Sequence, residues 1–114
     1  MLKLKEKDKE ILKEIKRVIM DVAKEMEVEI DKIILFGSRA RGDYREDSDW
    51  DILVVTKRKL DREKMISFLS KVYLRLAKYG TDADILVKAK EEFVRKSRFY
   101  GSIFYFIKNE GVRI

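Results

Sequence analysis

The 114-residue sequence contains no proline, no cysteine and no histidine. The absence of cysteine excludes disulfides, thiolate catalysis and zinc fingers. Without histidine, any general base must be a carboxylate or water, and any metal site must be built from oxygen ligands, which favour Mg²⁺ or Mn²⁺ over Zn²⁺. No apolar run approaches the length of a membrane span, and the amino-terminal residues alternate in charge, unlike a signal peptide. We therefore expect a cytoplasmic protein that does not interact with a membrane.

The sequence is rich in charged residues, which make up 42% of it, while hydrophobic residues make up 46%. This balance predicts a globular protein, and the weight of Lys, Glu and Arg suggests a thermophilic source. The length is that of a single domain, residues 1–114, with one core. The net charge of +6 is compatible with a nucleotide, an RNA or an acidic protein as partner, and does not choose among them.

The centre of the chain is a polar loop between two short apolar runs, residues 33–36 and 52–55. Such runs, bounded by turn residues, predict buried strands. Because strand side chains alternate, Asp49 and Asp51 face one way, with Cα atoms about 7 Å apart, while Trp50 faces the core. Two carboxylates at that separation repel each other unless a divalent cation neutralises them. A pair of Mg²⁺ ions is the usual device for displacement at a nucleotide phosphorus.

A second feature lies where the first strand ends. Gly37-Ser38 follows that strand, and a short helix is expected to start near Arg39. Backbone N–H groups at such a turn, together with the Ser38 hydroxyl, form a candidate cradle for an anion. Arg39 and Arg41 are candidates for contacts with phosphate oxygens. The loop therefore combines a candidate metal site at its end with a candidate phosphate-binding turn at its start.

In this order, the residues resemble the signature of the DNA polymerase β nucleotidyltransferase superfamily, which is Gly-Ser, then Ala-Arg-Gly, then Ser-Asp-x-Asp opening an apolar strand. The residues that carry the resemblance are Gly37, Ser38, Ala40, Arg41, Gly42, Ser48, Asp49 and Asp51. The chain is most similar to the minimal nucleotidyltransferases of that superfamily, which are small partners of HEPN-domain proteins. The resemblance covers nearly the whole chain and implies a nucleotidyltransferase fold.

Asp82 and Asp84 open a further strand, which continues as Ile85-Leu86-Val87. The two carboxylates share one face, so periodicity does not choose between them. In the family, the third metal carboxylate is an Asp followed at once by an apolar run. The resemblance therefore implies Asp84 as that ligand, with Asp82 at the mouth of the site.

The rest of the chain is predicted to be mainly helical. An amphipathic helix is expected within residues 1–27, another from Asp61 as N-cap to Gly80 as C-cap, and two short ones around 91–98 and 102–109. Residues 112–114 are a candidate final strand. The fold class is thus α/β (α+β), a small mixed sheet flanked by amphipathic helices. The last segment also carries five aromatic residues, which either pack in the core or form an exposed patch for a partner: Phe99, Tyr100, Phe104, Tyr105 and Phe106.

The resemblance implies a Mg²⁺-dependent nucleotidyltransferase, with catalytic and metal-binding residues Asp49, Asp51 and Asp84. Two Mg²⁺ ions, for which Mn²⁺ is a substitute, would be the cofactor, and ATP would be the substrate. Asp49 and Asp51 would hold metal and triphosphate. Asp84 would complete the second metal site and help to deprotonate the attacking hydroxyl.

The resemblance also implies nucleotide binding by Gly37, Ser38 and Arg41, which would hold the β- and γ-phosphates. Arg41 matches a phosphate-binding arginine of the motif. Arg39 has no such counterpart, which leaves it free to face solvent.

Family members that act on nucleic acids or antibiotics carry further domains for the acceptor, and 114 residues leave no room for one. We therefore expect the acceptor to be a partner, and the resemblance implies transfer of AMP to a HEPN-type toxin, with this chain as the antitoxin. An alternative is a binding module that neutralises its partner by contact. An RNA-binding domain ranks last, because the positive charges are interspersed with acidic ones. Homo- and hetero-oligomers both stay open.

Overall fold

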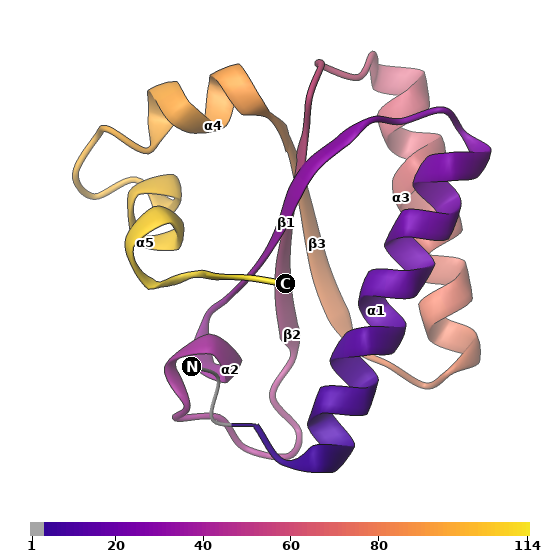
Figure 1. The fold of residues 1–114 in the computed structure, drawn as a ribbon, viewed down its shortest axis with the longest axis vertical. Coiled ribbons are helices and arrows are strands. Elements are labelled where there is room, and N and C mark those ends of the chain that lie inside the picture. Colours follow the sequence, from indigo (N-terminus) through magenta and orange to yellow (C-terminus); the bar gives the residue numbers. More distant parts are fainter. Residues whose placement is uncertain (1–3) are drawn as a thin grey trace.

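The computed structural model describes residues 4–114 as a central sheet with helices on both of its faces (Figure 1). The elements, in chain order, are α1 (Glu6–Glu25), β1 (Ile30–Phe36), α2 (Ser38–Arg41), β2 (Trp50–Thr56), α3 (Arg62–Lys78), β3 (Ala83–Ala89), α4 (Lys90–Lys96), α5 (Ile103–Glu110) and β4 (Val112–Arg113). This arrangement confirms the predicted mixed sheet flanked by amphipathic helices. Within residues 4–114, no helix has the length and apolar character needed to cross a membrane.

The sheet has four strands in the order β3-β2-β1-β4. Strand β1 pairs antiparallel with β2 and with β4, whereas β2 and β3 run parallel. Parallel neighbours need a long crossover, and α3 supplies it. The register sets Asp51 of β2 opposite Phe36 on one side and opposite Asp84 on the other. Two acidic residues far apart in the sequence thus become neighbours across the sheet.

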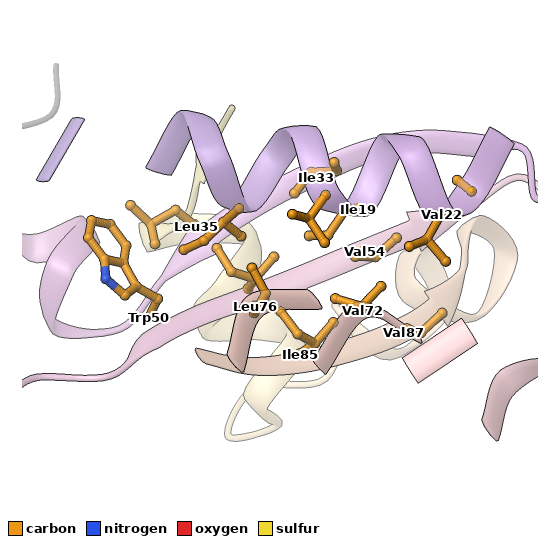
Figure 2. Close-up of a cluster of buried hydrophobic side chains, with 14 of the residues drawn as sticks. Ile19, Val22, Ile33, Leu35, Trp50, Val54, Val72, Leu76, Ile85 and Val87 are labelled. Atoms are coloured by element: carbon orange, nitrogen blue, oxygen red, sulfur yellow. The ribbon is translucent and has the colours of Figure 1, made fainter. Parts of the chain in front are cut away.

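Helices α1 and α3 cover one face of the sheet and enclose the larger core (Figures 1 and 2). In each helix, apolar residues recur every three or four positions and form one stripe that faces the strands, as the sequence predicted. The buried residues shown in Figure 2 are Ile19, Val22, Ile33, Leu35, Trp50, Val54, Val72, Leu76, Ile85 and Val87. Trp50 lies in this core and is 3% exposed, which confirms that it points away from the acidic residues.

Helices α4 and α5 cover part of the opposite face, where a smaller core forms. Its buried members are Ile34, Leu53, Val55, Phe93, Phe104 and Ile107. Side chains alternate along a strand, so Asp51 shares this face with Leu53. By the same rule, Asp84 shares it with Leu86, which packs at the border of the smaller core. Both carboxylates therefore lie on the α4–α5 side of the sheet.

The predicted helix boundaries hold closely. The Asp61 side chain caps α3 by accepting a hydrogen bond from the Lys64 backbone N–H at 2.8 Å, and Ser102 caps α5 in the same way. Strand β1 starts at Ile30, three residues before the predicted apolar run, because Ile30 and Lys32 pair with Thr56 and Val55 of β2. Backbone pairing, which does not require apolar side chains, extends this strand beyond its apolar core.

Candidate active site

The candidate site is built around Asp51, which is half-buried on β2 with Asp84 beside it on β3 and Asp49 just before the strand. Asp49 and Asp84 are exposed. Burial raises the pKa of the Asp51 carboxyl, and the negative charges of Asp84 and then Asp49 raise it further, while Arg41 opposes them. The three carboxylates of the sequence prediction therefore occupy one electrostatic patch, with Asp51 at its centre.

The chemistry of this patch fits a hard divalent cation. Carboxylate oxygens are the ligands that Mg²⁺ prefers, and the unfavourable charge on Asp51 is of the kind that a cation relieves. Among residues 4–114, no three acidic side chains already converge closely enough to form a metal-binding group.

Gly37 joins the two halves of the site, because its backbone lies directly against Asp51. It adopts φ +77° and ψ −159°, a combination that is almost restricted to glycine. A Cβ at this position would collide with Oδ2 of Asp51 and lie 3.1 Å from its Cγ. The turn after β1 and the acidic start of β2 are therefore in contact, as the sequence pattern required.

The short helix α2 starts at Ser38, as predicted, and holds the remaining phosphate-type residues. The backbone N–H groups of Ala40 and Arg41 each donate to the Gly37 carbonyl at 3.1 Å. Arg41 is exposed, with its guanidinium 3.4 Å from Asp43 and 3.8 Å from Glu110 of α5. Exposed ion pairs of this kind are weak, so a phosphate group can replace them. Sequence reasoning did not identify Glu110 as a neighbour of the site.

Arg39 does not face solvent, which corrects the expectation from the motif. It is 3% exposed, with its Nη2 and Nε atoms donating to the Ser48 carbonyl at 2.8 and 3.1 Å. Nη2 also donates to the Glu46 carbonyl at 3.1 Å. The guanidinium stacks on Trp50 at 4.2 Å and on Tyr44 at 4.7 Å from the ring centroids. These contacts leave it unable to reach a phosphate.

Helix α1 completes the environment of Arg39. Oδ1 of Asp8 lies 3.4 Å from Nη1 of Arg39, while the Tyr44 hydroxyl donates to Oδ2 at 3.1 Å. Arg39 thereby ties α1 and α2 to the loop that ends at Ser48, directly before Asp49. The flanking Gly-Ser and Asp-x-Asp patterns gave no local signal for this role, which depends on where α1 lies.

We expect Arg39→Met to lower the free energy of unfolding by about 3 kcal/mol, because it leaves the partly buried Asp8 carboxylate and two loop carbonyls without the buried guanidinium that they contact. The matched control is Arg41→Met, which removes only exposed ion pairs and should cost less than about 1 kcal/mol. Urea unfolding followed by circular dichroism measures both. Equal effects of the two substitutions would contradict the role assigned to Arg39.

The pH dependence of stability should carry a contribution from Asp51. Its pKa is raised from the ordinary 3.8, so the folded state disfavours the ionised carboxylate. This stabilising contribution is complete below the ordinary pKa and is lost as the pH rises through the raised one. Between about pH 4 and pH 7, the Tm of Asp51→Asn in EDTA should therefore gain on that of the wild-type chain. If the Tm values of the two proteins changed with pH in parallel, folding would not disfavour the ionised form of Asp51.

The structure separates the two acidic residues that open β3. Asp84 pairs with Asp51, whereas Asp82 precedes the strand and accepts a hydrogen bond from the Trp50 backbone N–H through its carbonyl, at 3.1 Å. The Asp82 side chain lines a different depression, beside Arg39 and the start of α1. The Tyr73 hydroxyl of α3 accepts a hydrogen bond from the Ile85 backbone N–H at 2.8 Å.

Comparison with known proteins gives consistent matches. The family model described as "Polymerase beta, Nucleotidyltransferase" matches residues 9–110. A protein of Methanocaldococcus jannaschii, named as a candidate protein adenylyltransferase, is 33% identical over 92% of this chain and 96% of its own length. A second protein of that organism, with the same kind of name, is 46% identical over 59% of this chain and 62% of its own.

Solved structures share the fold at low identity. The crystal structure of a candidate nucleotidyltransferase has a TM-score of 0.57 and 23% identity, covering 90% of this chain and 96% of the other. A toxin–antitoxin structure with AMP-PNP has a TM-score of 0.50 and 20% identity, covering 85% and 69%. A variant of the MntA–HpeT toxin–antitoxin has a TM-score of 0.51 and 19% identity, covering 87% and 70%.

Proposed function

Because this chain belongs to the polymerase β nucleotidyltransferase family, we propose that it transfers AMP from ATP to a hydroxyl group of a partner protein. The observation that carries the proposal is the contact between Gly37 and Asp51, with Asp84 paired to Asp51 on the next strand. This contact brings a turn suited to phosphates against a patch suited to Mg²⁺. Residues 1–114 would act as one nucleotidyltransferase domain.

In the reaction, the acceptor oxygen forms a bond to the α-phosphorus of ATP. The bond from that phosphorus to the oxygen bridging the α- and β-phosphates breaks, and pyrophosphate leaves. The hydroxyl proton passes to a carboxylate or to water, since the sequence offers no histidine as a base. Asp84 is exposed and pairs with Asp51 across the sheet, and it is our choice for assisting this step.

Asp49, Asp51 and Asp84 would hold Mg²⁺, for which Mn²⁺ could substitute by ligand chemistry. Bound Mg²⁺ supplies positive charge that stabilises the attacking and leaving oxygens. Asp51, whose ionised form is disfavoured in the metal-free chain, would gain most from such a charge. Asp51 pairs with Asp84 across the sheet and follows Asp49 by two residues, so it would be the central carboxylate of the ligand set.

Gly37, Ser38 and Arg41 would hold the β- and γ-phosphates. The glycine lets the backbone approach closely, Ser38 offers a hydroxyl at the start of α2, and Arg41 offers an exposed guanidinium. The Arg41 guanidinium lies 3.8 Å from Glu110 of α5, on the α4–α5 side of the sheet that also carries Asp51, and its positive charge partly offsets the raised pKa of that carboxyl. Phosphate groups placed there would lie next to the metal ligands.

The choice of a protein as acceptor is supported by the relatives, because two of the curated matches carry names of candidate protein adenylyltransferases. A neighbour of the same fold is a toxin–antitoxin structure with AMP-PNP, an ATP analogue. We therefore infer a HEPN-type toxin as the acceptor and an antitoxin role for this chain, acting in a hetero-oligomer with that partner. Silencing would follow from the covalent AMP.

The test is to purify the chain with its partner and to incubate the complex with Mg²⁺ and ATP labelled at either the α- or the γ-phosphate. Label from the α position alone on the partner, dependent on Mg²⁺ and lost with EDTA, is the expected result. Label from the γ position would make the protein a kinase and overturn the assignment. An intact complex with neither label would favour neutralisation by contact.

A further inference from the structure

One exposed apolar surface is not used by the proposed reaction. We call it the α4–α5 surface, and it consists of Val94, Phe99, Tyr100, Ile103 and Phe106, which are between 41% and 83% exposed. Phe104, the remaining phenylalanine of this segment, is buried in the smaller core. The structure thus answers the alternative left open by the sequence, because core packing accounts for Phe104 and not for its exposed neighbours. Contiguous exposed apolar side chains of this kind mark interaction sites.

The aromatic part of this surface is ordered by contacts within itself. The ring centroids of Tyr100 and Tyr105 lie 5.2 Å apart, and those of Tyr105 and Phe106 lie 5.6 Å apart, both with edge-to-face geometry. Tyr100 also meets Phe106 at 6.3 Å. Such packing holds the rings in place before any partner arrives, which reduces the entropy lost on binding.

A basic depression adjoins the apolar residues. Its volume is about 450 Å³, and it is lined by Lys57, Lys90, Glu91, Val94, Arg95 and Arg98. Four of these six residues are cationic and one is anionic, so the depression favours a partner that presents carboxylates. Val94 belongs to both features, and Arg98 directly precedes Phe99. Apolar anchors and positive charge are therefore parts of one continuous surface.

The α4–α5 surface also has a fixed relation to the candidate site. Ile103 stands at the start of α5, and Glu110 at its end lies 3.8 Å from Arg41. Eight helical residues span about 12 Å, at 1.5 Å per residue. Both regions lie on the side of the sheet that carries Asp51. The basic depression lies farther away, because Lys57 follows Asp51 by six strand residues, or about 20 Å. A protein seated on this surface would therefore extend along α5 to reach the reacting centre.

From these observations we propose that the α4–α5 surface docks an acidic segment with apolar anchors, belonging to the protein that accepts AMP. This inference rests on the proposed function and adds to it the place and the chemistry of acceptor recognition. A second copy of this chain is a poor occupant, since a symmetric dimer would bring the same mainly positive patch of both copies together. A single-stranded nucleic acid is also disfavoured, because Val94 and Ile103 offer no stacking face and the rings of Tyr100 and Phe106 pack against Tyr105.

A defined probe tests the surface before the acceptor has been identified. A phage-displayed library of random peptides is selected on the full chain, and the selected peptides are resynthesised with a fluorophore for anisotropy measurements. We expect acidic peptides with large apolar residues, bound about tenfold more weakly by Tyr100→Ser/Ile103→Ser and by Arg95→Glu/Arg98→Glu. The matched controls are Ile66→Ser/Leu74→Ser and Arg62→Glu/Lys71→Glu on α3, which change equally exposed residues on the other side of the sheet and should bind as the wild type does.

Several results would overturn the proposal. These are selected peptides without an acidic bias, no selection at all, or equal losses in the control variants. Binding of a labelled oligouridine that is lost in Tyr100→Ser/Ile103→Ser would assign the surface to nucleic acid instead. In the transfer assay, a selected peptide should compete with the acceptor and leave AMP-PNP binding, measured by calorimetry, unchanged. A wild-type chain that fails to bind AMP-PNP would refute the proposed function, and the peptide data would still report on the surface.

Discussion

Replacing Asp49 and Asp51 together by Asn should slow AMP transfer by about a thousandfold, which corresponds to about 4 kcal/mol in the activation barrier. The substitution keeps the side-chain shape and removes the two negative charges that hold a metal. It also removes repulsion around Asp51, whose pKa is raised by burial and by its acidic neighbours. Transfer should therefore be lost while the metal-free protein stays folded, with a Tm no lower than that of the wild type.

Two sets of controls make this prediction specific. Asp43→Asn/Asp47→Asn also neutralises two carboxylates, both exposed in the loop before β2, and should leave the transfer rate within about twofold. Asp84→Asn should behave like the double substitution, whereas Asp82→Asn should not, because only Asp84 pairs with Asp51. Initial rates with ATP labelled at the α-phosphate measure all four. If Asp82→Asn were the damaging one, the assignment of the third carboxylate would be wrong.

Gly37→Ala should reduce both stability and transfer. The backbone conformation at this position costs a residue with a Cβ about 1–3 kcal/mol, before any contact is considered. The added methyl group would in addition meet the Asp51 carboxylate, so either the turn or the metal ligand must move. A displacement of about 1 Å at a reacting centre can cost a hundredfold in rate. We therefore expect a transfer rate lower by about a hundredfold and a lower midpoint in urea.

Gly80→Ala is the matched control for this substitution. Gly80 also has a positive φ, +67°, but a Cβ there would meet no atom within 4 Å. It should therefore show the backbone cost of about 1 kcal/mol and no change in transfer. The difference between the two variants isolates the contact with Asp51. A Gly37→Ala chain with the transfer rate of Gly80→Ala would mean that this contact does not matter to the reaction.

The local patterns of the sequence were sufficient for most of the fold. Alternation around Trp50 correctly separated a core residue from two acidic neighbours, and the apolar spacing of residues 11–26 and 65–76 predicted the helices that cover the larger core. The predicted cap Asp61 directly precedes α3, and the short helix expected around residues 102–109 starts at Ile103. These features depend on neighbours within one turn or one strand, so a single sequence contains the information.

Only part of the candidate site could be predicted from such local patterns. Asp49 and Asp51 are linked by the period of a strand, and Gly37 by the short loop that precedes them. The tertiary structure alone decided that Asp84 pairs with Asp51, because the register of a parallel pair is set by how α3 crosses the sheet. Periodicity left Asp82 and Asp84 equivalent, and the family resemblance favoured Asp84. The register places Asp84, and not Asp82, opposite Asp51.

The burial of Arg39 and the exposure of the α4–α5 surface were also not predictable from the sequence. An arginine in a polar loop has no local feature that predicts burial, and α1 buries Arg39 by bringing Asp8 to it. Five aromatic residues in a short segment predict apolar contacts without saying which of them are covered. By itself, the sequence determined the elements, their apolar faces and the chemical character of the central loop. Only the tertiary structure decided adjacency and exposure, because both depend on which distant segments pack against each residue.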